Sequence, residues 1–352
     1  MRLQRLIIGI QILLLLILLS SKGMAANCDS SPFIAPETDR NRLESGLTGK
    51  WVQSFDEKRL TIKDIDGNSW DYYAIEKKPE NPQGLVLFLH GFPEFAHAWE
   101  QQLEYFGNTH HAVAIDLKGH HYSSSPDNIE EYDFIELAWE TRALIRCLGY
   151  DTATIVGHDF GGALGWIMGM LHPDAVDGLV ILSVPHPYLF GRALLDPNSD
   201  QAQRSRYMDY ARGTTLSDQL NFSKIIFSDL SIFESGFYSG TRILRLMLEN
   251  WVPTSRWKTM KHYYRAMPYP ANEQDYPVKL TAFQKKIYSV KRPTLFLWGL
   301  SDPYFAPETL NGIEELVPDL ELIIYPNGTH WLHHEAEDLN LRIDTFLSRI
   351  LP

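Results

Sequence analysis

The chain has 352 residues, 44% of them hydrophobic and 22% charged, and its 44 acidic and 32 basic side chains give a formal charge of −12. This composition is typical of a globular protein with a sizeable core and excludes a disordered chain. The acidic balance gives no electrostatic footprint for nucleic acid or an anionic membrane. Two cysteines exclude a disulfide-rich scaffold and a four-thiolate zinc site, and the absence of a sequence repeat excludes solenoids and propellers.

The N-terminal residues 1–26 have the order of a secretory signal peptide: basic residues, an apolar run over 6–19, and then small residues. The run is shorter than the roughly 20 residues that span a bilayer as a helix. We therefore expect an exported protein, periplasmic or secreted, with no stable membrane association after cleavage; an uncleaved membrane anchor is the alternative. Export permits a disulfide between Cys28 and Cys147, but the helical pattern around Cys147 favours a buried free thiol.

Short apolar runs alternate with helical patterns in most of the remaining chain. The runs are rich in Val, Ile, Leu and Phe, as expected for strands that are buried on both faces of a parallel sheet, and cover residues 85–89, 113–115, 154–156, 179–182, 294–298 and 322–325. Residues 133–148 predict an amphipathic helix with Asp133 as its N-cap. This alternation predicts an α/β fold.

The alternation stops between residues 186 and 292, where helical patterns and many aromatic side chains replace the apolar runs. We interpret this stretch as a helical cap that is inserted between two sheet strands, over the carboxyl edge of the sheet where ligands of α/β proteins bind. The predicted organisation is a signal peptide or anchor at 1–26, an irregular segment at 27–50, the first part of the core at 51–185, the cap at 186–292 and the second part of the core at 293–352.

The motif GHDFGG at residues 157–162 follows a predicted strand and precedes a helical pattern. A strand, a Gly-x-X-x-Gly turn and a helix are the context of a nucleophile elbow, which needs glycines because the turn is sharp. The central residue is Asp159 rather than serine or cysteine. A carboxylate at the positive end of a helix stays ionised and can act as a nucleophile. Alternatively, Asp159 is only the N-cap of the helix.

Candidate partners of Asp159 follow it along the chain, because in elbow enzymes an acid and then a histidine come after the nucleophile. Asp302 follows the strand at 294–298 and His330 follows the strand at 322–325, so both are expected at the carboxyl edge of the sheet. The loop at 183–185 carries no carboxylate, which favours Asp302 as the acid. A turn aspartate and a structural loop histidine are the alternatives.

The motif HGFP at residues 90–93 follows the first predicted parallel strand, where the fold is expected to supply an oxyanion donor. We assign the two donors to the backbone N–H groups of Phe92 and Phe160. Three histidine pairs, at 110–111, 120–121 and 333–334, lack metal-ligand spacing, and we predict them to be surface residues. No metal and no other cofactor is expected.

An aspartate nucleophile predicts a reaction at saturated carbon. Its carboxylate can displace a leaving group from such a carbon and form an alkyl–enzyme ester. Water activated by His330, which Asp302 orients, would then attack the ester carbonyl, and the oxyanion hole would serve this second half. The leaving group is either a halide or the oxygen of a strained ring.

The chain resembles the epoxide hydrolases of the α/β-hydrolase superfamily. The resemblance is carried by HGFPE at 90–94 with Trp99 downstream, GHDFGG at 157–162, SVPHP at 183–187, the Trp298-Gly-x-x-Asp302 motif and Thr329-His330-Trp331. It implies an α/β-hydrolase fold and two cap tyrosines that hold and protonate the epoxide oxygen. The matching positions are Tyr207 and Tyr264, for which packing within the cap is the alternative role.

These motifs also lead us to assign His90, Pro93 and Trp331 to the substrate pocket. We therefore expect an epoxide hydrolase that converts a small apolar epoxide and water to a vicinal diol, with no nucleic-acid partner. Haloalkane dehalogenases are similar too, but they hold halide with a tryptophan after the nucleophile, where this chain has Phe160. Fluoroacetate dehalogenases place an arginine there. Both dehalogenase alternatives lose support because a leaving anion needs hydrogen-bond donors from side chains. A non-catalytic ligand-binding protein on the same fold is a third alternative.

Overall fold

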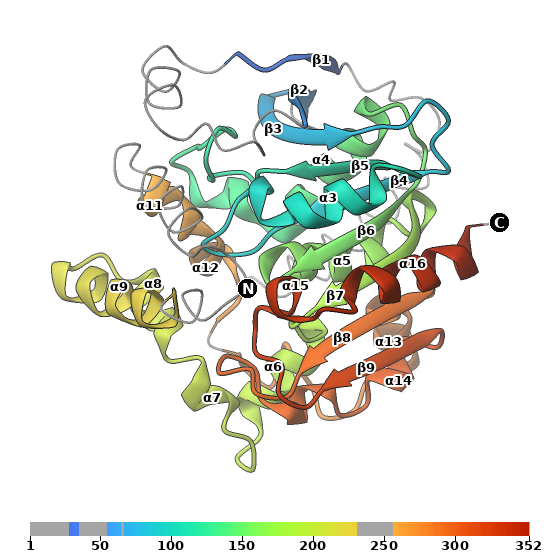
Figure 1. Ribbon diagram of the computed structural model, residues 1–352. Coiled ribbons are helices and arrows are strands. Elements are labelled where there is room, and N and C mark those ends of the chain that lie inside the picture. Colours follow the sequence, from blue (N-terminus) through green and yellow to red (C-terminus); the bar gives the residue numbers. More distant parts are fainter. Residues whose placement is uncertain (1–27, 35–54, 65–66, 231–255, 270, 352) are drawn as a thin grey trace.

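A nine-stranded sheet forms the centre of the described chain (Figure 1). The computed structural model describes residues 28–34, 55–64, 67–230, 256–269 and 271–351. The strand order is β1-β2-β3-β5-β4-β6-β7-β8-β9. The strands are β1 (Asp29–Pro32), β2 (Asp56–Lys63), β3 (Ser69–Lys77), β4 (Leu85–Leu89), β5 (His111–Ile115), β6 (Ala153–His158), β7 (Val176–Leu182), β8 (Thr294–Gly299) and β9 (Leu320–Tyr325).

Strands β4 to β9 pair in parallel with one another, which confirms the predicted parallel sheet. Every side chain of β4, β6 and β8 is buried, as continuous apolar strands between two helical layers should be. The three remaining strands, β1 to β3, are antiparallel and extend one edge of the sheet. Parallel neighbours end at the same edge, so the loops after β4, β6, β8 and β9 come together there.

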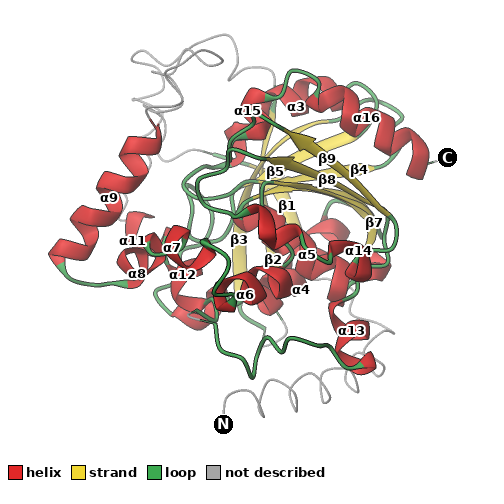
Figure 2. Cartoon of the chain, turned by 90° about the horizontal axis from the view of Figure 1, so that it is seen from below, coloured by secondary structure: helices red, strands yellow, loops and turns green. Residues whose placement is uncertain are grey.

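Helices cover both faces of the sheet (Figure 2). Each face has its own cluster of buried apolar side chains. Helices α3 (Glu100–Phe106) and α16 (Leu339–Ile350) lie on one face, and α4 (Phe134–Cys147) and α5 (Phe160–Leu171) lie on the other. The side chain of Asp133 accepts a hydrogen bond from the N–H of Ile135 at 2.8 Å and caps α4 as predicted. The shorter helices of the core are η1 (Ala96–Trp99), η2 (Ile129–Tyr132), η3 (Pro173–Ala175), η5 (Pro307–Leu310), α14 (Ile313–Leu316) and α15 (Leu332–Glu335).

The chain between β7 and β8 is helical wherever it is regular and described, which confirms an inserted helical cap. Several of these helices gather beyond one edge of the sheet (Figures 1 and 2). Residues 231–255 of this insertion lie outside the described residues. The helices are α6 (Pro187–Leu195), α7 (Gln201–Arg204), α8 (Tyr207–Arg212), α9 (Leu216–Leu230), α11 (Arg256–Met260), α12 (His262–Ala266) and α13 (Ala282–Tyr288).

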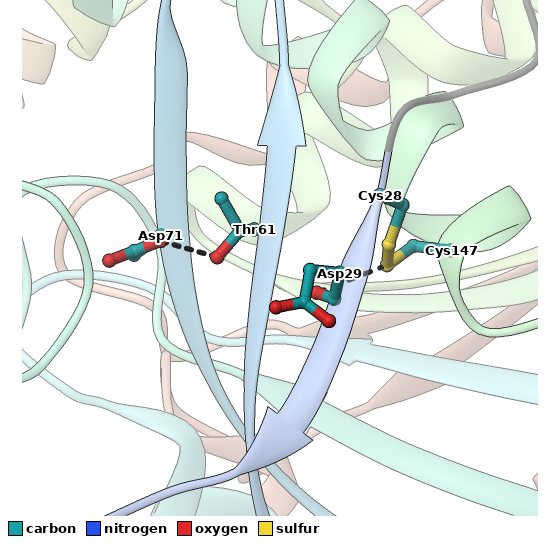
Figure 3. Close-up of a disulfide and its surroundings, with 5 residues drawn as sticks. All are labelled: Cys28, Asp29, Thr61, Asp71 and Cys147. Atoms are coloured by element: carbon teal, nitrogen blue, oxygen red, sulfur yellow. Dashed lines mark hydrogen bonds between the residues drawn. A yellow bond between two sulfur atoms is a disulfide. The ribbon is translucent and has the colours of Figure 1, made fainter.

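Cys28 and Cys147 form a disulfide, so the prediction of a free thiol at Cys147 is wrong (Figure 3). Their Cα atoms are 5.5 Å apart, within the usual range for a disulfide. Cys147 is the last residue of α4 and is only half-buried, which makes its sulfur accessible to the incoming N-terminal segment. Cys28 reaches it because the next residues form β1, which pairs with β2 from Asp29 opposite Thr61. The segment that was predicted to be irregular therefore begins with a strand.

Two predicted segments lie wholly or partly outside the described residues. The signal peptide at 1–26 is the first, and the segment at 27–50 is described only over residues 28–34. Within the described ranges, no helix is long and apolar enough to cross a membrane.

Candidate active site

Asp159 stands on a sharp turn between β6 and α5. Its backbone has φ +50° and ψ −117°, and a non-glycine residue keeps such a positive φ only where its surroundings enforce it. The turn requires glycine at residue 161, where a Cβ atom would lie 2.1 Å from the carbonyl oxygen of Leu89. The Asp159 side chain makes no cap hydrogen bond to α5. Asp159 thus occupies the N-cap position of α5 without capping it through its side chain, and the strained turn directs its carboxylate toward the loop after β4.

The two oxygens of the buried Asp159 carboxylate have different neighbours. Oδ1 accepts a hydrogen bond from the N–H of Phe92 at 2.8 Å. Oδ2 lies 3.7 Å from Nε2 of His330, which is longer than a hydrogen bond. Burial alone raises the pKa of Asp159, but His330 and the Phe92 N–H outweigh burial and hold this pKa below its usual value. Asp159 is thus ionised at neutral pH, and Oδ2 is the oxygen that Phe92 leaves open.

His330 and Asp302 form a hydrogen-bonded pair beside Asp159. The Nδ1–H of His330, in the loop after β9, donates to Oδ2 of Asp302 at 2.8 Å. Oδ1 of Asp302, in the loop after β8, accepts the N–H groups of Tyr304 and Phe305 at 2.7 and 3.1 Å. Both side chains are buried. The pair orients the imidazole so that Nε2 faces Asp159, and the three residues that were singled out by their order in the sequence meet in one site.

Two carboxylates act on the His330 imidazole. Burial lowers the pKa of a histidine, but the charges of Asp302 and Asp159 and the hydrogen bond to Asp302 outweigh it and raise the pKa of His330 to about 10. His330 therefore holds a proton at neutral pH while Asp159 is ionised. An event that neutralises Asp159, such as formation of an ester, removes one of these charges and lowers the pKa of His330. The arrangement can thus turn His330 from a cation into a neutral base during a reaction.

Tyr207 and Tyr264 bring two phenols from the cap to this site. Tyr207 is the first residue of α8 and Tyr264 lies in α12, and their rings pack edge to face with centroids 5.8 Å apart. Both line the same pocket as Asp159 and His330. Burial, and then the charge of Asp159, raise the pKa of Tyr207 well above its usual value, and burial does the same for Tyr264. Both phenols therefore keep their protons at neutral pH and can donate them.

The pocket is largely apolar apart from its reactive groups. A site of this kind suits a small apolar ligand with one polar atom that the phenols and the carboxylate can address. Pro93, which follows a cis peptide bond, and Trp331 are in its wall. The lining residues are Phe92, Pro93, Asp159, Tyr207, Ile226, Tyr264, Tyr304, His330 and Trp331.

The two assigned oxyanion donors are the backbone N–H groups of Phe92, in the loop after β4, and of Phe160, the residue that follows Asp159. The N–H of Phe92 already points at Oδ1. Phe160 opens α5, so its N–H is one of the first amides of a helix, which have no intrahelical acceptor. Backbone N–H groups fixed in this way can stabilise negative charge on Oδ1 without reorganising.

The structure corrects the assignment of His90 to the substrate pocket. The side chain is fully buried beneath the loop that carries Phe92. Its Nε2 accepts the N–H of Leu117 at 2.9 Å, so the proton is on Nδ1, which donates to the carbonyl of Gly91 at 2.8 Å. Burial lowers the pKa of His90 and keeps it neutral. Both ring nitrogens are thus used to hold the loop, and none is available to a ligand.

The prediction that the three histidine pairs lie on the surface is also wrong. Some of these side chains have partners on elements far away in the sequence, and others bind groups a few residues away. The Nε2–H of His111 donates to Glu76 at 3.2 Å, and the Nδ1–H of His121 donates to Asp116 at 2.7 Å. Five are buried and one is half-buried: His110, His111, His120, His333 and His334, with His121 as the half-buried member.

Glu94 is the centre of a buried cluster of histidines behind the active site. It accepts hydrogen bonds from Nε2–H of His333 at 2.9 Å and of His334 at 2.6 Å, and Nδ1 of His158 lies 3.5 Å away. The Nε2–H of His158 donates to the carbonyl of His330 at 2.8 Å. The donor set is one that zinc accepts, but two ligands of one zinc ion lie about 3.3 Å apart. The observed spacing is that of direct hydrogen bonds, so the cluster does not fit a metal as it stands.

Sequence reasoning gave no role to two residues of this region. Glu94 closes the HGFPE motif, and its partners in the fold are more than 200 residues away, so no local pattern could reveal its role. Tyr304 lines the pocket, and its ring packs on those of Tyr207 and His330 with centroids 5.2 and 4.9 Å apart. Its position two residues after Asp302 was the available signal, because it shares the loop of the acid.

Known proteins share this arrangement of the chain. A family profile described as the alpha/beta hydrolase fold matches residues 84–337. Epoxide hydrolase 3 of Xenopus tropicalis is 31% identical over 288 residues, which cover 78% of this chain and 74% of the relative. This chain belongs to the epoxide hydrolases of the α/β-hydrolase superfamily. The human epoxide hydrolase 4 is 28% identical, with 82% of this chain and 78% of the relative covered.

Solved structures of epoxide hydrolases superpose on most of this chain. The epoxide hydrolase of Bacillus megaterium in complex with an inhibitor has a TM-score of 0.69 and 29% identity, and covers 79% of this chain and 97% of its own. A mutant of an epoxide hydrolase from Bacillus megaterium, in complex with its product, a naphthyloxy-propane-1,2-diol, has a TM-score of 0.69 and 30% identity, and covers 82% and 99%. Almost the whole chain of each of these enzymes therefore has a counterpart in this chain.

Proposed function

We propose that this epoxide hydrolase opens small apolar epoxides to vicinal diols through an alkyl ester on Asp159. One observation carries the proposal: an ionised carboxylate with one open oxygen shares a pocket with two protonated phenols and a histidine–carboxylate pair. A carboxylate attacks saturated carbon well only if the leaving oxygen is protonated as it departs, and the phenols supply that proton. A product diol bound to the related Bacillus megaterium enzyme supports the same reaction class.

In the first half-reaction, Oδ2 of Asp159 attacks one ring carbon of the epoxide. The Oδ2–C bond forms while the ring C–O bond breaks, and the departing oxygen takes a proton from Tyr207 or Tyr264. Oδ1 stays on the N–H of Phe92 and becomes the carbonyl oxygen of the ester. The assignment of Oδ2 follows from geometry, because this oxygen is on the side of His330 and the pocket.

In the second half-reaction, water attacks the ester carbonyl. Once Asp159 is neutral, the pKa of His330 falls, and its proton returns to the tyrosinate through the pocket. The neutral imidazole then takes a proton from water, hydroxide adds to Cγ of Asp159, and the charge on Oδ1 is held by the N–H groups of Phe92 and Phe160. Collapse breaks the Cγ–Oδ2 bond, and the diol leaves with Oδ2 and a proton from His330. The new carboxyl group gives its proton back to His330, which closes the cycle.

The pocket favours an epoxide over a haloalkane. A departing halide needs N–H donors that point into the site, because it cannot be protonated at neutral pH. The residue after the nucleophile is Phe160, whose side chain carries no donor, and the two phenols suit an oxygen leaving group. A dehalogenase, and a protein that only binds its ligand, are thus the less favoured alternatives.

We further propose that the chain is exported, with residues 1–26 as a cleaved signal peptide. The disulfide between Cys28 and Cys147 supports this localisation, because disulfides persist mainly in oxidising compartments. The intact mass of the protein recovered from its native source tests it. A mature chain that starts close to Cys28, with two hydrogens fewer than the reduced form, is expected; a full-length, reduced chain would contradict it.

The activity itself is tested with a panel of small apolar epoxides and matched chloroalkanes. Diol formation from the epoxides without halide release from the chloroalkanes is expected, and Asp159→Asn should abolish it. Halide release at a comparable rate would favour the dehalogenase. Binding of the epoxides without turnover would leave only the ligand-binding role.

A further inference from the structure

One buried glutamine joins the cap to the loop that carries the catalytic acid. Gln201 is the first residue of α7 and is fully buried. Its Oε1 accepts the N–H of Ala306 at 2.7 Å, and its Nε2 donates to the carbonyl of Tyr304 and to Oγ of Ser205, both at 2.9 Å. The amide thus uses both of its N–H donors and its acceptor. It pairs with the 304–306 segment as a neighbouring backbone would.

The segment that Gln201 holds is the one that holds Asp302. The N–H groups of Tyr304 and Phe305 bind Oδ1 of Asp302, which leaves Oδ2 for His330. A second contact comes from the other end of α7, where Arg204 donates from Nη1 to the carbonyl of Asp302 at 2.6 Å. Both ends of helix α7 are therefore hydrogen-bonded to the loop that carries Asp302. A shift of this loop would move the carboxylate and with it the imidazole.

The same short helix leads into Tyr207, one of the two phenols that are proposed to protonate the epoxide oxygen. Ser205, which Gln201 contacts, is the C-cap that follows α7, and Tyr207 begins α8 two residues later. The ring of Tyr304 lies between the two halves of the site, with its centroid 5.2 Å from that of Tyr207 and 4.9 Å from that of His330. Gln201 thus connects Tyr207, the proton donor in the first half-reaction, with the Asp302–His330 pair, which acts in the second.

Packing alone does not call for an amide at this position. Glutamine is seldom fully buried, and an apolar side chain of similar length would fill the same volume without the cost of desolvating an amide. The amide is matched by three polar partners whose positions fix the acid loop relative to the cap. Such hydrogen bonds can fix the position of one segment relative to another, because hydrogen bonds are directional and apolar contacts are not.

We propose that Gln201 is a positioning residue that sets both half-reactions, by fixing the cap phenol Tyr207 and the Asp302–His330 pair relative to each other. The inference rests on the proposed function, since it assigns Tyr207 to ring opening and His330 to ester hydrolysis. It predicts that loss of the Gln201 amide slows both alkylation of Asp159 and hydrolysis of the ester, although Gln201 does not line the pocket that contains Asp159.

The test is rapid-quench single-turnover kinetics, which gives separate rate constants for formation and hydrolysis of the ester. Gln201→Leu removes the amide at similar side-chain volume. Gln201→Glu keeps an acceptor for the Ala306 N–H but has no N–H donors. Gln203→Leu is the matched control, because Gln203 is exposed on the same helix. We expect Gln201→Leu to lower both constants about tenfold per active site, Gln201→Glu to be intermediate, and Gln203→Leu to match the wild type. The pKa of the acidic limb of the pH–rate profile for hydrolysis, which reports deprotonation of His330, should also fall in Gln201→Leu, because a less firmly held Asp302 stabilises the imidazolium less.

Active-site titration with the trapped ester separates alignment from folding. If the constants per titrated site in Gln201→Leu stay within twofold of the wild type, or if Gln203→Leu loses as much, the positioning role is wrong. If only one of the two constants falls, Gln201 does not link the two halves and the proposal is equally wrong. Failure of the wild-type protein to form any diol would instead contradict the proposed function, so the two failures are distinguishable.

Discussion

The Nε2 atom of His330 lies 3.7 Å from Oδ2 of Asp159, while its Nδ1–H is hydrogen-bonded to Asp302 at 2.8 Å. The imidazole is thus anchored on one side and close to the nucleophile, without a hydrogen bond, on the other. This asymmetry lets Oδ2 attack a substrate carbon and still leaves Nε2 within reach of a water at the ester. The two half-reactions can therefore use one carboxylate and one imidazole in succession.

Replacement of His330 by glutamine should trap the ester. Glutamine is neutral and cannot take a proton from water, whereas Asp159, Tyr207 and Tyr264 remain to open the ring. We expect ester hydrolysis to slow by about 10³-fold, and the adduct on the Asp159 peptide to accumulate in mass spectra after a pulse of epoxide. A His330→Gln protein that turns over without a detectable adduct would contradict the role of His330.

The cap tyrosines should govern ring opening. Phenylalanine at Tyr207 or Tyr264 removes one proton donor, and we expect each single variant to slow alkylation by about 10²-fold and the double variant to abolish it with the fold intact. Tyr210→Phe is the matched control, because Tyr210 is exposed on the same helix as Tyr207. Stopped-flow alkylation rates and circular dichroism check this, and full activity of the double variant would remove the assignment.

The disulfide should stabilise the fold without taking part in catalysis. Cys147→Ser frees the start of β1 from the end of α4, and since a disulfide typically contributes about 2–4 kcal/mol, we expect a loss of this size in the free energy of unfolding. Urea titration measures this loss, and diol formation at 25 °C should stay close to the wild-type rate. Cys28→Ser removes the same bond, so the two substitutions together should cost no more than one. Losses in the free energy of unfolding that add up in the double variant would contradict a disulfide between Cys28 and Cys147.

Acid should destabilise the protein through buried neutral histidines. Burial lowers the pKa of His186 to about 4, below its value near 6.5 in the unfolded chain. Between these values the unfolded state binds more protons, so the stabilising contribution is present above pH 6.5 and is lost as the pH falls to about 4, by about 3 kcal/mol. Thermal unfolding from pH 7 to pH 4 in the wild type and in His186→Gln measures this contribution. The variant should show the flatter dependence, and parallel curves would contradict it.

The parts of the site that chain order and strand ends define were predictable from the sequence. Apolar runs marked the parallel strands, and the residue after each run had to emerge at one edge of the sheet. This is why Asp159, Asp302 and His330 could be selected without a structure. The α5 helix also follows from the elbow, although it begins at Phe160, earlier than the helical pattern indicated.

The features that were missed depend on contacts between distant residues. Strands β1 to β3 are antiparallel and carry mixed polar and apolar side chains, so their pattern differs from that of the buried parallel strands. Cys28 meets Cys147 across 119 residues, and His333 meets Glu94 across 239. A histidine whose partner is unknown is predicted to be a surface residue, and only the fold supplies the buried carboxylate that draws it inward. The same holds for His90, whose acceptor role depends on the loop after β5.

The central claim is that the substrate becomes an ester of Asp159 and that water then attacks the carboxyl carbon rather than the epoxide. A single turnover in H₂¹⁸O with enzyme in excess over epoxide tests this directly. The account predicts a diol whose new oxygen is unlabelled, because it comes from Oδ2, and an ¹⁸O atom in the carboxylate of the Asp159 peptide. Label in the diol from the first turnover, with none in Asp159, would contradict it.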